Sequence, residues 1–287
     1  MIIVKDLKYT YFGSESEVLH GLNFEIKKGE IFGFLGPSGS GKSTTQNILI
    51  GLLKNYHGSV QIMKKEVSEW GQEFYEHIGV SFEWPNHYLK LTALENLDYF
   101  KSLYSHQTHD SMTVLEWVGL KEDANKKVSD FSKGMKVRLS VARSLIHNPE
   151  ILFLDEPTSG LDPKNARNIK DLILNIRSQG TTVFVTTHNM MLADELCDRV
   201  AFITSGKLNL IDTPSILKRK YGKRFVKIEY RDENSNLNCE EFSLDDLAGD
   251  RFISFLKSTK NIETIHSEES TLDNIFIAVT GEGLSDE

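Results

Sequence analysis

Residues 36–43, which read GPSGSGKS, combine residue types that together bind phosphate. Glycines let the backbone turn tightly, so that successive N–H groups line a concave surface for an anion. A lysine adds positive charge, and the hydroxyl after it is a ligand for Mg²⁺, which bridges the β- and γ-phosphates of a nucleotide. The sequence therefore predicts a site for a nucleoside triphosphate and Mg²⁺, with the nucleotide bound by Gly36, Pro37, Ser38, Gly39, Ser40, Gly41, Lys42, Ser43 and Thr44. A Gly- and Ser-rich surface loop is the alternative.

Two adjacent carboxylates, Asp155 and Glu156, end an apolar run. One carboxylate can hold Mg²⁺, while its neighbour acts as general base toward a water that attacks the γ-phosphate. His188 ends another apolar run and is expected to contact that phosphate and fix the geometry of the glutamate. We predict Glu156, His188 and Lys42 as catalytic residues, and Asp155 and Ser43 as metal ligands. The alternatives are a solvated turn for the carboxylates and a structural role for the histidine.

These residues must be positioned by three short apolar runs, which lie at 30–35, 150–156 and 181–188. Nearly continuous apolar runs are typical of parallel strands buried on both faces. Ligands bind at the carboxyl ends of such strands, so the phosphate-binding loop, the carboxylates and His188 are expected to meet at one edge of a sheet. A helix is expected after the loop, at 44–50.

Other segments extend this core. Residues 2–10, 22–28 and 58–63 predict antiparallel strands, and 88–145 predicts a mostly helical insertion. A closing helix is predicted near the C-terminus because four apolar residues recur on one helical face: Leu272, Ile275, Phe276 and Val279.

At 287 residues the chain is longer than a common single domain, and its charge is unevenly distributed. From residue 221 onward there are 15 acidic and 7 basic residues, which accounts for the formal net charge of −8, whereas residues 1–220 carry 26 of each sign. We predict a nucleotide-binding domain at 1–218 and a small α+β accessory domain at 219–287. The lack of a basic stripe argues against nucleic acid as a partner. No apolar run reaches the ~18 residues that span a bilayer.

Across about residues 1–215 the chain resembles the ATP-binding cassette (ABC) family of transport ATPases. The resemblance implies an α/β fold, a P-loop NTPase with a RecA-like parallel sheet core, an antiparallel β subdomain and a helical insert. Besides the phosphate loop, three segments match: residues 151–156 as the second nucleotide motif, 131–135 in place of the family signature, and 159–162 as the loop that couples two sites. His188 resembles the switch histidine, and Glu83 stands where glutamine is usual. Tyr11 resembles the aromatic residue that stacks on adenine; its neighbours Tyr9 and Phe12, or ordinary packing of all three, are the alternatives.

The family's signature implies a second copy of the chain. Ser132 can cap a helix whose first N–H groups face an anion, and the resemblance implies that Ser132 and Gly134 cover the nucleotide bound by a second subunit, in a head-to-tail dimer. Lys133 and Met135 depart from the common Gly and Gln of this signature. Glu83 is implied as a third Mg²⁺ ligand.

The chain resembles the exporter type of ATP-binding subunit in three features: the sequence Ser-Lys-Gly-Met at 132–135, Glu83, and the acidic C-terminal segment. That resemblance implies an ATPase that uses ATP and Mg²⁺ to power export of an unknown substrate through separate integral membrane permease subunits, from a peripheral position at the cytoplasmic face of the cell membrane. The alternative is a soluble cassette ATPase that acts on the ribosome or DNA, although the chain has neither a second cassette nor a long coiled-coil insertion. Trp84, Pro85 and Tyr88 are predicted to line a groove for the membrane partner, with ordinary loop packing as the alternative.

Overall fold

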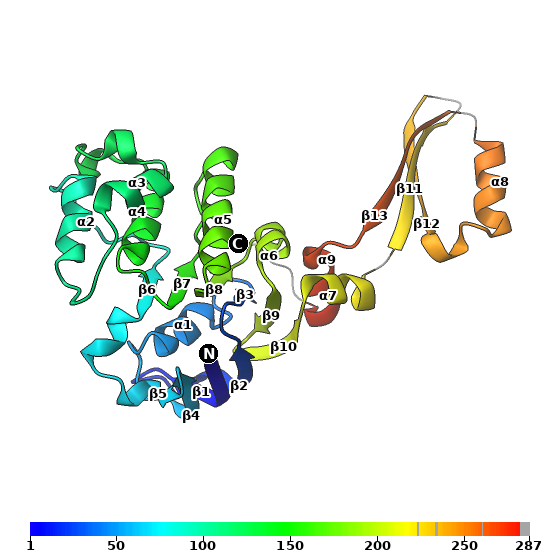
Figure 1. The fold of residues 1–287 in the computed structure, drawn as a ribbon. Coiled ribbons are helices and arrows are strands. Elements are labelled where there is room, and N and C mark those ends of the chain that lie inside the picture. Colours follow the sequence, from blue (N-terminus) through cyan, green and yellow to red (C-terminus); the bar gives the residue numbers. More distant parts are fainter. Residues whose placement is uncertain (223, 233–234, 260, 282–287) are drawn as a thin grey trace. The chain divides into compact units, whose positions relative to one another are not determined.

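The computed structural model describes residues 1–222, 224–232, 235–259 and 261–281. The chain divides into two compact units, formed by Met1–Thr213 (unit 1) and Pro214–Gly283 (unit 2) (Figure 1). The boundary expected after residue 218 falls inside helix α7 (Pro214–Tyr221), which belongs wholly to unit 2. A proline fits the first turn of a helix, where no intrahelical N–H bond is needed, so α7 starts at Pro214 and the junction precedes it.

A six-stranded sheet with the order β10-β9-β3-β8-β7-β6 forms the core of unit 1. Neighbouring strands run parallel except β9 and β10, which are antiparallel. Every residue of β3 and β8 is buried, as expected for parallel strands covered on both faces. The strands are β3 (Ile31–Leu35), β6 (Ile78–Ser81), β7 (Ile151–Asp155), β8 (Thr182–Thr187), β9 (Arg199–Thr204) and β10 (Lys207–Asp212).

An antiparallel sheet with the order β2-β1-β4-β5 packs against this core. Phe24 of β2 stacks on Phe32 of β3, with ring centroids 5.7 Å apart, so one hydrophobic cluster joins the two sheets. Strand β2 starts at Glu17 rather than at residue 22, because its pairing with β1 extends to Thr10. The strands are β1 (Ile2–Thr10), β2 (Glu17–Ile26), β4 (His57–Ile62) and β5 (Lys65–Glu66).

Helices connect the strands of unit 1. The predicted helix after the phosphate loop is α1 (Lys42–Leu49), and the predicted helical insertion contains α2 (Ala93–Lys101), α3 (Ser111–Trp117) and α4 (Lys133–Leu145). Helices α5 (Pro163–Ser178) and α6 (Met190–Leu196) follow β7 and β8. Short 3-10 helices lie at Val67–Glu69, Gln72–Glu76, Lys121–Asp123, Val128–Asp130 and, in unit 2, Leu244–Asp246.

Unit 2 has a core of its own. Its three-stranded antiparallel sheet, with the order β12-β11-β13, buries Val226, Ile228 and Phe242 against side chains that include those of α8. The closing helix α9 buries Leu272, Ile275 and Phe276, as its apolar spacing predicts. The elements are β11 (Arg224–Arg231), β12 (Leu237–Ser243), α8 (Asp250–Ser258), β13 (Ile262–Glu269) and α9 (Leu272–Thr280).

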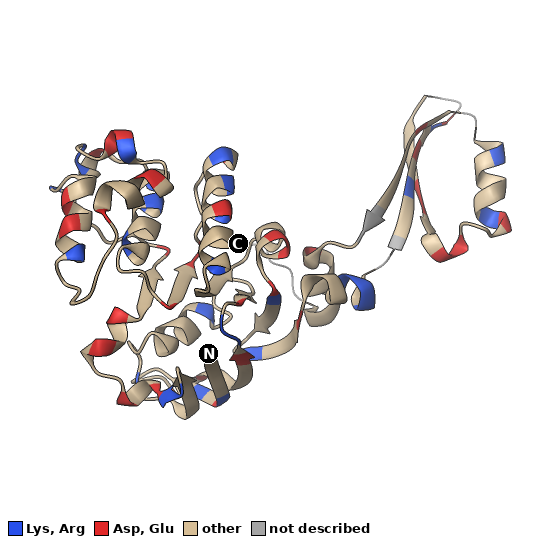
Figure 2. Ribbon diagram, viewed as in Figure 1, with Lys and Arg blue, Asp and Glu red and all other residues tan. Residues whose placement is uncertain are grey.

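Charged residues of both signs are interspersed along the helices of unit 1 (Figure 2). The basic residues Lys218, Arg219 and Lys220 end α7, and the acidic excess begins only after them. Within the part of the chain that the structure describes, no helix is both long enough and apolar enough to cross a bilayer.

Candidate nucleotide site

A cavity of about 330 Å³ lies where β3, β7 and β8 end. It brings together segments that are far apart in the sequence, as the convergence of parallel strand ends predicts. Its lining contains the phosphate loop, both adjacent carboxylates, Glu83 and His188; the residues are Val18, Ser38, Gly39, Gly41, Lys42, Ser43, Thr44, Glu83, Asp155, Glu156 and His188.

The loop after β3 folds around its own lysine. Lys42 Nζ donates to the carbonyl oxygens of Gly36 (2.7 Å) and Pro37 (2.9 Å), which fixes the side chain beside the cavity. Only glycine fits at position 36, because a Cβ there would lie 2.1 Å from the carbonyl oxygen of Ile203. Ser40 is buried and does not line the cavity.

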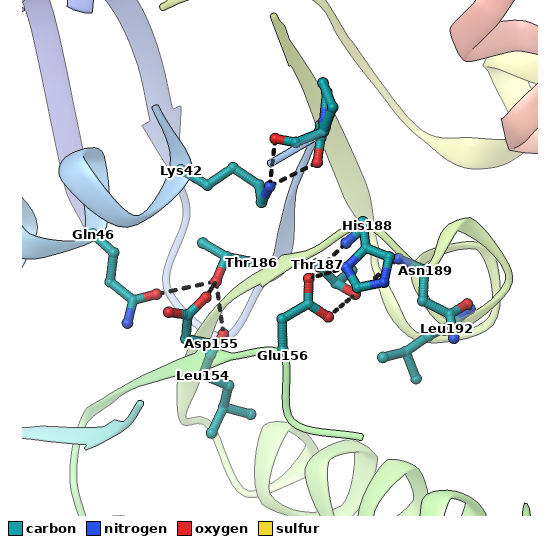
Figure 3. Close-up of polar contacts among 12 residues, drawn as sticks. Lys42, Gln46, Leu154, Asp155, Glu156, Thr186, Thr187, His188, Asn189 and Leu192 are labelled. Atoms are coloured by element: carbon teal, nitrogen blue, oxygen red, sulfur yellow. Dashed lines mark hydrogen bonds and ion pairs between the residues drawn. The ribbon is translucent and has the colours of Figure 1, made fainter. Parts of the chain in front are cut away.

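Asp155 carries the last side chain of β7 and accepts a hydrogen bond from the hydroxyl of Thr186 (Figure 3). Burial raises the pKa of Asp155, and the neighbouring carboxylates of Glu156 and Glu83 raise it further. Three acidic side chains thus share one cavity with one lysine, an arrangement whose electrostatics favour a bound cation.

Glu156 is held by donors from the end of β8. Its Oε2 accepts from Thr187 Oγ1 (2.8 Å), while its Oε1 accepts from the backbone N–H of His188 (2.8 Å) and lies 2.6 Å from His188 Nδ1 (Figure 3). Its backbone has a φ of 46°, in the left-handed region that non-glycine residues rarely adopt. Strain of this kind is commonly found at functional sites.

The remaining predicted nucleotide residues do not line this cavity. Tyr11 is 41% exposed, and its hydroxyl lies 3.0 Å from Thr44 Oγ1, which borders the cavity. Ser132 caps α4 by accepting from the backbone N–H of Met135 (3.2 Å). Gly134 lies against Gly160 instead, where an added Cβ would stand 3.2 Å from the Gly160 carbonyl oxygen.

Three polar residues at the site were missed by the sequence analysis. Thr186 and Thr187 donate to the two carboxylates, and Thr186 Oγ1 also lies 3.3 Å from Gln46 Oε1 on α1. A signal existed for the threonines, since two hydroxyl residues directly precede His188 at the end of a predicted buried strand. Gln46 gives no such signal, because it stands within an ordinary helical run.

A second, larger groove lies between the nucleotide core and the helical insertion. It has a volume of about 540 Å³ and is lined by Ile50, Leu52, Tyr75, Ile78, Val80, Phe82, Asn86, His87, Tyr88, Phe100, Tyr104, Arg143 and Ser144. The groove prediction is correct for Tyr88 and wrong for Trp84 and Pro85, which are not part of the lining. The indole of Trp84 is 75% exposed and faces the ammonium group of Lys133 instead.

Comparison with known families and structures agrees with this geometry. Residues 19–159 match the model of the ABC transporter family, and residues 224–269 match that of the fluoroquinolone efflux ABC transporter C-terminal domain. A dimeric ATP-binding cassette in a post-hydrolysis state with ADP and phosphate has 30% sequence identity and a TM-score of 0.68; the match covers 74% of this chain and 98% of that one.

Curated relatives extend the likeness to nearly the whole chain. A fluoroquinolones export ATP-binding protein of Mycobacterium tuberculosis is 50% identical over 285 residues, which cover 99% of this chain and 95% of the relative. The bacitracin transport ATP-binding protein of Bacillus licheniformis is 38% identical over 225 residues, or 78% of this chain and 73% of that protein. These proteins are export or transport subunits, so the ribosome or DNA alternative has no support. The chain belongs to the ABC transporter family, as one of its ATP-binding and ATP-hydrolysing subunits.

Proposed function

We propose that the chain powers export of amphipathic aromatic drugs of the fluoroquinolone class through separate membrane permease subunits, from the cytoplasmic face of the cell membrane. The observation that carries this proposal is the 50% identity that extends over 99% of the chain, including the unit that matches a fluoroquinolone efflux domain. The test is drug accumulation in cells that express the chain together with its membrane permease subunits. We expect accumulation to fall in those cells and not in cells whose chain carries Lys42→Ala; equal accumulation would contradict the proposal.

In this proposal the phosphate loop binds the nucleotide. Backbone N–H groups of Ser38 to Thr44 and the start of α1 hold the phosphates, and Lys42 turns from its loop carbonyls to the β- and γ-phosphates. Tyr11, whose hydroxyl lies 3.0 Å from Thr44 Oγ1, stacks on the adenine.

The acidic part of the cavity suits Mg²⁺. Among the described residues no cluster of three or more His, Cys, Asp or Glu side chains is arranged to hold a metal by itself. Mg²⁺ is usually held by one or two carboxylates together with phosphate and water oxygens, which fits Ser43, Asp155 and Glu83 on the cavity wall. When bound, the ion would neutralise charge on the phosphates.

Glu156 acts as general base in this proposal. The hydroxyl of Thr187 and the backbone of His188 hold its carboxylate against the end of β8, so the group is aimed at the cavity before the nucleotide binds. His188 Nδ1 faces Glu156, which leaves Nε2 to contact the γ-phosphate. Replacing Glu156 with Gln keeps the side chain's shape and removes the base.

The Glu156→Gln variant therefore tests the assignment. We expect it to bind ATP with wild-type affinity and to lose at least about a hundredfold in kcat, the usual contribution of a general base. Lys42→Ala should instead weaken ATP binding. Wild-type turnover by Glu156→Gln would remove Glu156 from the mechanism.

A head-to-tail dimer of two copies completes each site in this proposal, with Ser132 and Gly134 of one chain over the nucleotide of the other. The dimeric cassette structures with 30% identity support it. Specific activity should then rise with protein concentration in the range where the dimer forms. A specific activity that is constant down to monomeric concentrations would contradict a shared site.

A further inference from the structure

Lys133, the first residue of α4, lies beside two loops of unit 1. Its methylene groups cover Gly160, so that a Cβ added there would lie 3.3 Å from Lys133 Cδ and 3.5 Å from Cε. Its ammonium nitrogen lies 5.5 Å from the ring centroid of Trp84. One side chain at the start of α4 thus contacts the loop after β6 and the loop after β7.

Each of the two contacted loops begins at the nucleotide cavity. Trp84 is bonded to Glu83, which lines the cavity. Gly160 belongs to the turns between Glu156 and Asp162, where the backbone N–H of Ser159 donates to the Glu156 carbonyl oxygen (3.0 Å). The far end of those turns is fixed by Asp162, which caps α5.

The contact depends on a side chain that the common signature lacks. With Gly at position 133, the stem over Gly160 and the charge over Trp84 would both be missing. A Lys ammonium over an indole is attracted by the negative face of the ring, and Trp is the ring that binds cations best. Gly160 has a φ of 69° and no side chain, so it leaves space for the lysine stem.

We propose that Lys133 is a positioning residue for ATP hydrolysis: it fastens the Glu83 loop and the Glu156 loop to the signature helix α4, so that the three move together when the site closes. This inference rests on the roles proposed above for Glu83 and Glu156. Lys133 itself is not among the residues that line the cavity.

The first test is a kinetic double-mutant cycle on the full chain. Lys133→Met keeps the stem and removes the charge, and Trp84→Leu removes the ring. We expect each change to lower kcat for ATP about two- to fivefold, the factor that corresponds to an exposed cation–π pair, with little change in KM. The double variant should be no slower than the slower single variant, because both changes remove the same contact.

Matched variants separate this role from a loss of folding or of surface charge. Lys133→Arg keeps a cation over the ring and should retain wild-type kcat. Lys126→Met removes an exposed lysine of the same helical insertion, whose partner is Asp123, and should have no effect. Additive effects in the cycle, or a raised KM in Lys133→Met, would overturn the proposal, since a raised KM would mean that the lysine binds nucleotide directly.

A second readout does not depend on turnover. The chain has three tryptophans, so Trp70→Phe with Trp117→Phe leaves Trp84 as the single indole. We expect addition of Mg-ATP to change its fluorescence, and Lys133→Met to reduce that change while Lys133→Arg preserves it. If Lys133→Met shows the same fluorescence change as the wild type, the inference is overturned, whatever the turnover of Glu156→Gln. If Glu156→Gln keeps wild-type turnover, the role proposed for Glu156 is wrong, but the fluorescence result for Lys133 still holds. The two proposals can therefore fail separately.

Discussion

At the level of single residues, the nucleotide site gathers three carboxylates around one cavity. Asp155, Glu156 and Glu83 share the cavity with Lys42, whose ammonium group is turned toward loop carbonyls. Burial and the neighbouring carboxylates raise the pKa of Asp155, although its carboxylate accepts a hydrogen bond from Thr186. Its ionised form is thus destabilising until a cation binds.

Replacement of Asp155 by Asn should therefore stabilise the protein without metal. A raised pKa in the folded state means that stability falls as the pH rises from the unfolded-state pKa through the folded-state pKa, so the penalty is complete only above the folded-state pKa. Asn keeps the acceptor for Thr186 and removes the charge. We expect Tm in EDTA to rise by about 2–4 °C, which corresponds to a gain of about 1 kcal/mol in the free energy of unfolding. We also expect Mg-ATP to raise the Tm of this variant by less than it raises that of the wild type. An unchanged or lower Tm in EDTA would show that the carboxylate is not destabilising.

At the level of elements, two buried histidines fasten helix α4 to the core. His87 Nε2 donates to the Lys136 carbonyl of α4, and His147, just after α4, donates from Nε2 to the Ile78 carbonyl of β6 (both 2.9 Å). Among the residues that the structure describes, the second nitrogen of each ring is buried and has no hydrogen-bond partner. A proton there would place an unsolvated charge inside the protein.

Acid should consequently loosen the helical insertion. Burial lowers the pKa of both His87 and His147 from 6.5 to about 4. Because the rings are neutral in the folded protein and take up protons when it unfolds, their stabilising effect is complete above pH 6.5 and is lost as the pH falls toward 4. The loss amounts to about 3 kcal/mol for each ring.

Urea unfolding between pH 7 and 4.5 measures this effect. The wild-type midpoint should fall steeply below pH 6.5, and His87→Gln with His147→Gln should flatten the curve. His57→Gln, at an exposed histidine, serves as the control variant for the loss of a histidine side chain. A double variant with the wild-type slope would assign the acid sensitivity to other groups.

The groove beside α4 is where we expect a helix of the permease to dock. It is lined by exposed apolar side chains, among them Leu52 (57% exposed) and Tyr75 (43%). Leu52→Asp with Tyr75→Asp should abolish co-purification with the membrane subunit and leave the basal ATPase activity of the isolated chain intact. Leu103→Asp is the matched control, because Leu103 is 61% exposed but lies outside the lining. Undiminished co-purification would exclude this groove as the docking site.

The same elements show what the sequence can predict. The phosphate loop is one contiguous motif, and the meeting of Asp155, Glu156 and His188 follows from the rule that parallel strands end together. Strand β6 was not predicted, because four residues with a glycine carry no clear periodicity. The contact of Lys133 with Trp84 joins loops about 50 residues apart and depends on how α4 packs, so no local pattern announces it.

At the level of the whole molecule, the nucleotide site and the acidic excess belong to different units. Every residue that lines the nucleotide cavity lies within Met1–Thr213, which has its own hydrophobic core. The match to a solved dimeric cassette covers 98% of that protein but only 74% of this chain. That protein therefore forms a cassette without a counterpart of the remaining quarter of this chain. Unit 2 has a separate core around Val226, Ile228 and Phe242.

A chain that ends after Thr213 should accordingly fold and bind nucleotide. Because the whole lining of the nucleotide cavity belongs to unit 1, we expect its Kd for Mg-ATP to stay within about twofold of that of the full chain. Isothermal titration of both proteins measures this, and the truncated chain with Lys42→Ala supplies the non-binding control. A loss of more than about tenfold, or about 1.4 kcal/mol, in a truncated chain that unfolds cooperatively would mean that unit 2 contributes to the nucleotide site. Wild-type affinity would instead restrict unit 2 to steps after ATP binding, such as subunit pairing or transport.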